Sequence, residues 1–186
     1  MQGITELAKE KAKELLSSGK AQRVLGWQKG EFMYDQTPQS FAKVEELDNL
    51  VYDSFSAPNL SKYLISESQK EGVTAVFLKP CDTYSFNQLL KEFRVKRENV
   101  YVVGVQCNGK LNYEKLTAAA GDRISEVLSD GLTVEVKTAS GKVEKFDRKD
   151  VLFDKCLACK GKEHKAYDEL LLSGEQLDVR GEDKFK

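Results

Sequence analysis

The sequence lacks any hydrophobic run long enough to cross a membrane. Its longest apolar stretch, Val100 to Val105, is six residues, whereas a membrane-spanning helix needs about 20. Residues 1–16 are rich in charge and contain no apolar core of a secretory signal. We therefore expect no membrane insertion and a cytoplasmic location.

The sequence also lacks a large net charge. The 29 Lys and Arg residues nearly cancel the 30 Asp and Glu residues, which leaves a formal charge of −1 at pH 7. No overall field would therefore draw the chain to nucleic acid, and no nucleic-acid partner is expected. Internal repeats, low-complexity linkers and a GxGxxG motif are absent too.

What is present suits a folded domain. A chain of 186 residues with 40% hydrophobic content buries about 70% of its unfolded surface without help from metals or disulfides. We predict one α/β domain over residues 1–172, followed by a charged, frayed tail over residues 173–186.

The centre of the chain has the clearest pattern. Apolar strands are predicted at residues 73–78 and 99–105, with a helix at 84–93 between them. A strand–helix–strand unit of this length, with strands apolar on both faces, is typical of a covered parallel sheet.

The flanking segments complete the predicted fold. Alternation and a glycine turn at Ala139-Ser140-Gly141 predict a β-hairpin over residues 132–146. The fold class is thus a mixed α/β sheet with a central parallel βαβ unit, flanking helices and a β-hairpin before a cysteine-containing C-terminal tail. Strands are expected at residues 21–28 and around 32–34, and helices at residues 4–16, 44–55, 59–69, 111–120 and 123–128 and in the second half of the tail segment 155–174.

Four cysteines form the one constellation that carries chemistry. Cys81 and Cys107 each follow one of the two central strands, and Cys156 and Cys159 form a CxxC pair. Neighbouring parallel strands lie about 4.8 Å apart, and ligands gather at the carboxyl edge of such sheets. Four thiolates that meet at this edge would be a complete ligand set for one iron–sulfur cluster.

Three alternatives remain open on spacing alone. The cysteines could hold a structural zinc ion, Cys156 and Cys159 could be a dithiol redox pair, or all four could be thiols without a common centre. His164, the only histidine, lies in a basic frame around the CxxC with several lysines. With four thiols available, His164 is not expected to be a ligand.

Two charged residues flank Cys81. Asp82 is expected to cap a helix that begins at Tyr84, through a backbone N–H near Ser85. Lys79 is the candidate to face an anion, either the cluster or a flavin phosphate, and its alternative is a surface position.

Three ordered motifs together resemble a known family. They are Lys-Pro-Cys-Asp at 79–82, Gly-Val-Gln-Cys-Asn-Gly at 104–109, and Lys-Cys-Leu-Ala-Cys-Lys at 155–160 with Tyr-Asp-Glu-Leu-Leu at 167–171. With the segment at 56–64, they are similar to the deazaflavin-coenzyme hydrogenase/dehydrogenase beta-subunit family, which includes related subunits of formate dehydrogenases and heterodisulfide-reductase-like complexes. The resemblance runs from about residue 20 to 172.

The resemblance implies an oxidoreductase subunit that transfers electrons inside a redox complex, with its other subunits as partners. It implies that Cys81, Cys107, Cys156 and Cys159 ligate a [4Fe–4S] cluster. Several members also bind flavin, so FAD is a further cofactor candidate, in a flavoenzyme that couples hydride to single-electron transfer. Unlike many relatives, this chain has no repeated C-x₂-C-x₂-C run.

Overall fold

The computed structural model describes residues 3–161, 163–173 and 177. It divides into two compact units. The large unit comprises the described residues of Met1–Cys107 and Lys160–Gly174, and the small unit those of Asn108–Cys159 and Glu175–Lys186. The single α/β domain expected over residues 1–172 stays a prediction.

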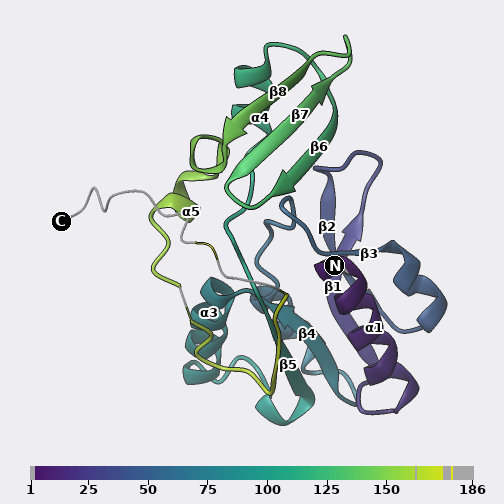
Figure 1. Cartoon of the computed structure of the whole chain (residues 1–186). Coiled ribbons are helices and arrows are strands. Elements are labelled where there is room, and N and C mark those ends of the chain that lie inside the picture. The colour runs from purple at the N-terminus through teal and green to yellow at the C-terminus, as the bar shows by residue number, and fades with distance from the viewer. Residues whose placement is uncertain (1–2, 162, 174–176, 178–186) are drawn as a thin grey trace. The chain divides into compact units, whose positions relative to one another are not determined.

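Figure 1 shows the elements of both units along the chain. Short 3₁₀ helices are labelled η. The elements are α1 (Ile4–Ser17), β1 (Arg23–Lys29), β2 (Gln36–Phe41), η1 (Val44–Asn49), β3 (Leu50–Val51), η2 (Ser61–Tyr63), α2 (Leu64–Glu67), β4 (Thr74–Leu78), α3 (Pro80–Lys91), η3 (Arg97–Asn99), β5 (Val100–Val105), α4 (Tyr113–Ala120), β6 (Ile124–Asp130), β7 (Thr133–Thr138), β8 (Val143–Asp147), η4 (Arg148–Val151), α5 (Asp154–Leu157) and β9 (Glu169–Leu171).

The large unit is built on a mixed sheet in the order β2-β1-β4-β5-β9, with β3 also paired to β1. Strands β1, β4, β5 and β9 run parallel, and β2 and β3 run antiparallel to β1. All five residues of β4 are buried, as expected for a central strand covered on both faces. The predicted α/β fold class, with its central parallel βαβ unit β4-α3-β5, is confirmed.

Helix α1 packs one apolar stripe on this sheet. Ala8, Ala12 and Leu15 are fully buried and lie at the i, i+4 and i+7 positions of one helix face. Gly19, with φ 71°, follows the helix end, and this left-handed conformation costs glycine little. The apolar stripe therefore fixes how α1 covers the sheet.

The small unit contains an antiparallel sheet in the order β6-β7-β8. The predicted hairpin is confirmed as β7 and β8, which join through Ala139-Ser140-Gly141. The predicted helix at residues 123–128 is wrong, because this segment is strand β6. A register shift between Ile124 and Glu126 leaves Ser125 as an extra residue, and such a bulge breaks the strand alternation that a sequence pattern relies on.

Other predicted elements also differ. The expected helix at 44–55 is η1 followed by β3, and the expected helix at 59–69 contains η2 and the short α2. The strand expected around residues 32–34 lies later, as β2, and the helix expected in the tail segment is strand β9. Strand β3 pairs with β1, and strand β9 pairs with β5. These tertiary contacts override the weak helical preference of the two short segments.

The predicted frayed tail, residues 173–186, lies outside the described residues apart from Ser173 and Leu177. Among the residues that the structure describes, no helix combines the length and apolar character needed to span a bilayer.

Candidate functional site

Cys81 lies in the first turn of α3, directly after β4. Helix α3 begins at Pro80, a residue that suits the first helical position. The prediction that Asp82 caps a helix beginning at Tyr84 is therefore wrong, because Asp82 is already the third residue of α3. Cys81 is exposed and free of disulfides, and the N-terminal turn of a helix favours a thiolate there.

Lys79 and Asp82 form a buried ion pair beside this thiol. Lys79 Nζ lies 2.9 Å from Asp82 Oδ2, and the two side chains are 3% and 2% exposed. The Cys81 thiol donates to the other Asp82 oxygen, Oδ1, at 3.6 Å. Asp82 thus connects the buried ammonium of Lys79 to the cysteine.

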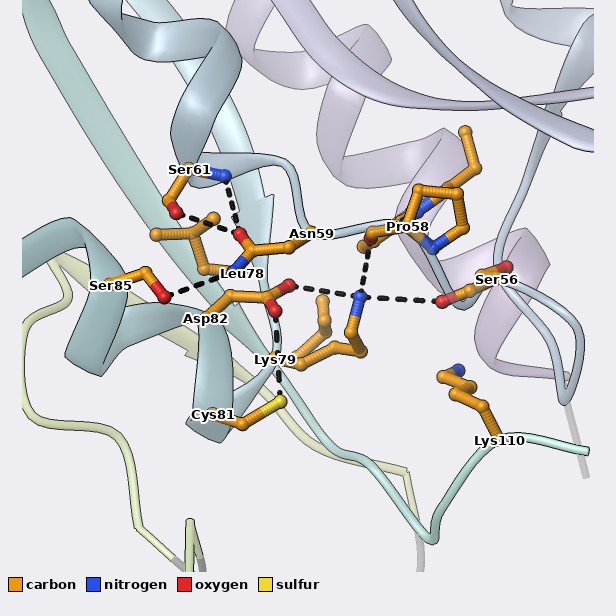
Figure 2. A network of polar contacts seen from close by, with 12 residues as sticks. Ser56, Pro58, Asn59, Ser61, Leu78, Lys79, Cys81, Asp82, Ser85 and Lys110 are labelled. Atoms are coloured by element: carbon orange, nitrogen blue, oxygen red, sulfur yellow. Dashed lines mark hydrogen bonds and ion pairs between the residues drawn. The ribbon is translucent and has the colours of Figure 1, made fainter. Parts of the chain in front are cut away.

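The remaining contacts of Lys79 tie the β4 end to a neighbouring loop. Figure 2 shows Lys79 between Asp82, Pro58 and Ser56. Its ammonium donates to the Pro58 carbonyl at 2.8 Å and to the Ser56 carbonyl at 3.3 Å, and it lies 4.4 Å from the Trp27 ring centroid. The surface position considered for Lys79 is wrong, whereas its assignment as a cofactor-binding residue stays a prediction.

Cys107 follows the neighbouring strand β5 and is half-buried. The hydroxyl of Tyr52 donates to the carbonyl of Gln106, the residue before Cys107, at 2.6 Å, which brings it close to the Cys107 side chain. Burial raises the pKa of Tyr52 well above its usual value, and nearby Cys107 and Asp82 raise it further. Tyr52 therefore presents a neutral hydroxyl to Cys107.

The returning segment at residues 160–171 lies against both strand ends. His164 Nε2 is 3.2 Å from the carbonyl of Leu78 at the end of β4 and 3.2 Å from that of Val105 at the end of β5. Because both partners are acceptors, Nε2 carries the proton. Burial lowers the pKa of His164.

Glycine is required where this segment meets Cys81. A Cβ added to Gly161 would lie 2.9 Å from both the Cα and the backbone nitrogen of Cys81, a distance too short for any larger residue without backbone movement. One residue, Lys160, separates Cys159 from Gly161.

The CxxC pair belongs to the small unit. Cys156 lies in α5, and its backbone carbonyl accepts a hydrogen bond from the N–H of Cys159 at 3.3 Å. The backbone N–H of Lys110 donates to Cys156 Sγ at 3.4 Å. An N–H group aimed at sulfur is the type of contact that tunes a bound cluster.

The structure thus brings the predicted ligands together in part. Cys81 and Cys107 stand at the carboxyl ends of adjacent parallel strands of the large unit, with Leu78 in register with Gly104, and Cys156 and Cys159 share one turn of the small unit. Within residues 3–161, 163–173 and 177, no three His, Cys, Asp or Glu side chains are grouped as a metal site. The meeting of all four thiols stays a prediction.

The donor set nevertheless fits a thiolate-bound cofactor. None of the four cysteines forms a disulfide, and none is fully buried. Cys81 lies in the first turn of α3, the Tyr52 hydroxyl lies close to Cys107, and a backbone N–H donates to Cys156 Sγ. These are environments that stabilise negative sulfur.

Sequence reasoning missed Tyr52, Trp27 and the packing role of His164. Trp27 is the only tryptophan of the chain, and it is buried in β1. Nothing in the sequence spacing of these residues relates them to Cys81 or Cys107. Trp27 and His164 are each more than 50 positions from the nearer of the two cysteines, and Tyr52 is 55 positions from Cys107. Only the sheet order brings them to one edge.

Comparison with known proteins gives independent evidence. No family model matches the chain. The beta subunit of the F420-dependent formate dehydrogenase 1 of Methanococcus maripaludis is 32% identical over 97 residues, which are 52% of this chain and 25% of that protein. The corresponding subunit from Methanocaldococcus jannaschii is 30% identical over 100 residues, 54% of this chain and 26% of that protein. The resemblance to the F420 hydrogenase/dehydrogenase beta-subunit family is confirmed.

A solved structure shares the fold. A chain of the F420-reducing [NiFe] hydrogenase complex from Methanosarcina barkeri superimposes with a TM-score of 0.66 and 13% identity, over 84% of this chain and 61% of that chain. The present chain therefore carries the fold seen in that complex. It spans about a quarter of the length of the curated beta subunits that it matches.

Proposed function

We propose that this chain is an electron-transfer subunit that holds one [4Fe–4S] cluster on Cys81, Cys107, Cys156 and Cys159. It relays electrons to and from other subunits of a hydrogenase, formate dehydrogenase or heterodisulfide-reductase-type complex. The observation that carries the proposal is the placement of Cys81 and Cys107 directly after β4 and β5, which are adjacent and parallel.

The covalent chain supports a common site for all four thiols. Gly161 packs against the Cys81 backbone and is two steps along the chain from Cys159, a span of at most about 7 Å between Cα atoms. Lys110 donates to Cys156 Sγ and is three steps along the chain from Cys107, a span of at most about 11 Å. Each CxxC cysteine is thus tied by a short chain segment to one of the strand-end cysteines.

A bound cluster would supply one-electron exchange at this edge. The chain's own part would be to hold the thiolates and to set their electrostatics. Cys81 lies in the first turn of α3, the Tyr52 hydroxyl lies close to Cys107, and the backbone N–H of Lys110 donates to Cys156 Sγ. These groups favour a negatively charged cofactor over a neutral one.

The relatives are named as subunits of F420-dependent enzymes, which supports a place inside a multi-subunit redox complex. Two other cofactors compete with the cluster. FAD would make the chain a flavoprotein that couples hydride transfer to single-electron transfer, and zinc would make it a non-redox interaction module.

Anaerobic purification followed by analysis of iron, acid-labile sulfide, zinc and flavin tests the proposal. We expect iron and sulfide in equal amounts and a broad brown absorption. Resolved yellow flavin bands without iron, or a colourless protein with one zinc ion, would replace the proposal with the corresponding alternative. A colourless protein without metal after reconstitution with iron and sulfide would refute it.

A further inference from the structure

The hydroxyl of Tyr52 donates to the carbonyl of Gln106 at 2.6 Å and so lies close to the side chain of the next residue, Cys107. Tyr52 follows β3, and its own side chain is buried at 2% exposure. Its backbone is clamped by Thr5, whose hydroxyl donates to the Tyr52 carbonyl at 2.7 Å and accepts from the Tyr52 N–H at 3.1 Å. These two hydrogen bonds restrain the Tyr52 backbone and therefore the position from which its side chain extends.

The ring of Tyr52 is held as firmly as its backbone. It packs against Trp27 with centroids 5.0 Å apart and an interplanar angle of 36°. The indole N–H of Trp27 donates to the Pro58 carbonyl at 3.1 Å, and the ammonium of Lys79 lies over the same indole. The Tyr52 hydroxyl is therefore delivered to one place, between the Gln106 carbonyl and the Cys107 side chain.

That hydroxyl has one proton and two acceptors. While Cys107 is a thiol, the proton is donated to the Gln106 carbonyl at 2.6 Å, and the thiol can donate to the phenolic oxygen. A thiolate has no proton to give and is a stronger, charged acceptor. A rotation about the C–O bond then turns the Tyr52 proton from the carbonyl to the sulfur, with no movement of the ring.

We propose that Tyr52 is a positioning residue that donates a hydrogen bond to the Cys107 thiolate and thereby raises the reduction potential of a cluster bound there. This inference rests on the proposed function. A reduced cluster carries more negative charge on its sulfur ligands than an oxidised one, so a donor to sulfur stabilises the reduced state more. The buried and immobile donor requires no reorganisation when the electron arrives.

The first test compares Tyr52→Phe with the parent protein after anaerobic reconstitution with iron and sulfide. The substitution keeps the ring that packs on Trp27 and removes only the hydroxyl. We expect equal iron and sulfide content and a more negative midpoint potential. Tyr101→Phe is the matched control, because Tyr101 bonds Lys20 and Glu169 at the other end of β5, and its potential should equal that of the parent.

The second test strengthens the donor without disturbing the fold. Growth on 3-fluorotyrosine replaces the hydroxyls of all seven tyrosines with more acidic ones. The midpoint potential should rise in the parent and stay unchanged in Tyr52→Phe. If Tyr52→Phe does not fold, the parent protein alone is compared with and without 3-fluorotyrosine, and an unchanged potential would contradict the role of Tyr52.

The third test uses metal-free, reduced protein. At one fixed pH, alkylation of Cys107, followed by peptide mass spectrometry, should slow by up to about tenfold in Tyr52→Phe, because the reacting thiolate loses a hydrogen-bond donor. Cys81 serves as the internal control. The alkylation rate tests the Tyr52–Cys107 hydrogen bond even if the parent protein binds no iron. Failure of the proposed function can therefore be distinguished from failure of this inference. Unchanged potentials and an unchanged Cys107 rate would overturn the role of Tyr52.

Discussion

The ion pair of Lys79 and Asp82 is the most deeply buried pair of charges recorded in the described residues. Both side chains are almost fully shielded from water, and Asp82 Oδ2 meets the ammonium as an ion pair without a further hydrogen bond. A pair of this kind adds little over an apolar pair, yet the loss of one partner leaves an uncompensated charge inside the protein. Lys79 and Asp82 are therefore coupled, and neither acts alone.

Asp82→Ala should lower the free energy of unfolding by about 3–5 kcal/mol, because the Lys79 ammonium loses its counter-charge. Chemical denaturation measures this loss. The double variant Lys79→Met/Asp82→Leu should recover most of it. A loss of only about 1 kcal/mol, the usual value of a helix cap, would contradict the buried pair. Glu135→Ala, which removes a surface partner of Lys145, is the control and should cost at most about 1 kcal/mol.

Cys107→Ser tests the other strand end. Because the large unit has an extensive apolar core around β4 and β5, we expect the fold to persist while the cluster is lost or converted. Circular dichroism and iron analysis on the same sample measure the two effects. Global unfolding of Cys107→Ser would instead indicate a structural metal site, since structural zinc contributes folding energy directly.

At the scale of elements, the site depends on where strands β4 and β5 end and on the segment that returns to them. Residues 160–171 place Gly161 on Cys81 and His164 on the two terminal carbonyls. A Cβ at Gly104 would lie 2.7 Å from His164 Cδ2, so β5 is adapted to this histidine as well. The segment therefore fastens the chain that leaves Cys159 to the edge that holds Cys81.

This fastening should weaken in mild acid. Burial lowers the folded-state pKa of His164 below its usual value near 6.5, so the unfolded chain binds the proton more readily. The stabilisation is full above pH 6.5 and declines as pH falls from there through the folded-state pKa. Unfolding free energies measured from pH 8 to pH 5 should fall less in His164→Gln than in the parent. Since the chain has one histidine, equal slopes between pH 7 and pH 6 would contradict the prediction.

The elements that carry strong periodicity were predictable and the others were not. The apolar strands β4 and β5 are visible in the sequence because parallel strands buried on both faces have few polar residues. Strand β6 looks helical because the bulge at Ser125 shifts its apolar residues out of alternation. The sequence pattern predicts a helix in the segment that contains β9. The three residues of β9 form a strand because they pair with β5.

For the whole molecule, the sequence predicts the α/β fold class and the resemblance to the beta-subunit family, because the cysteine motifs stand at fixed places relative to two recognisable strands. It could not predict the contacts among Tyr52, Trp27, Lys79 and Asp82, which require knowledge of the strand order β1-β4-β5. Nor could it predict the division into two units at Cys107 and Cys159. The two predicted ligands at these positions are the residues at which the chain passes from one unit to the other.

The central claim is that the four thiols hold one cluster that exchanges single electrons. The most direct test is an anaerobic redox titration of the purified chain that measures both electrons per chain and the slope of the titration curve. The account predicts one reversible electron per chain and a slope of about 59 mV per tenfold change in ratio. A two-electron curve, with a slope of about 30 mV, would indicate flavin or a dithiol pair, and the absence of any redox change in metal-loaded protein would indicate zinc. Either result would contradict the account.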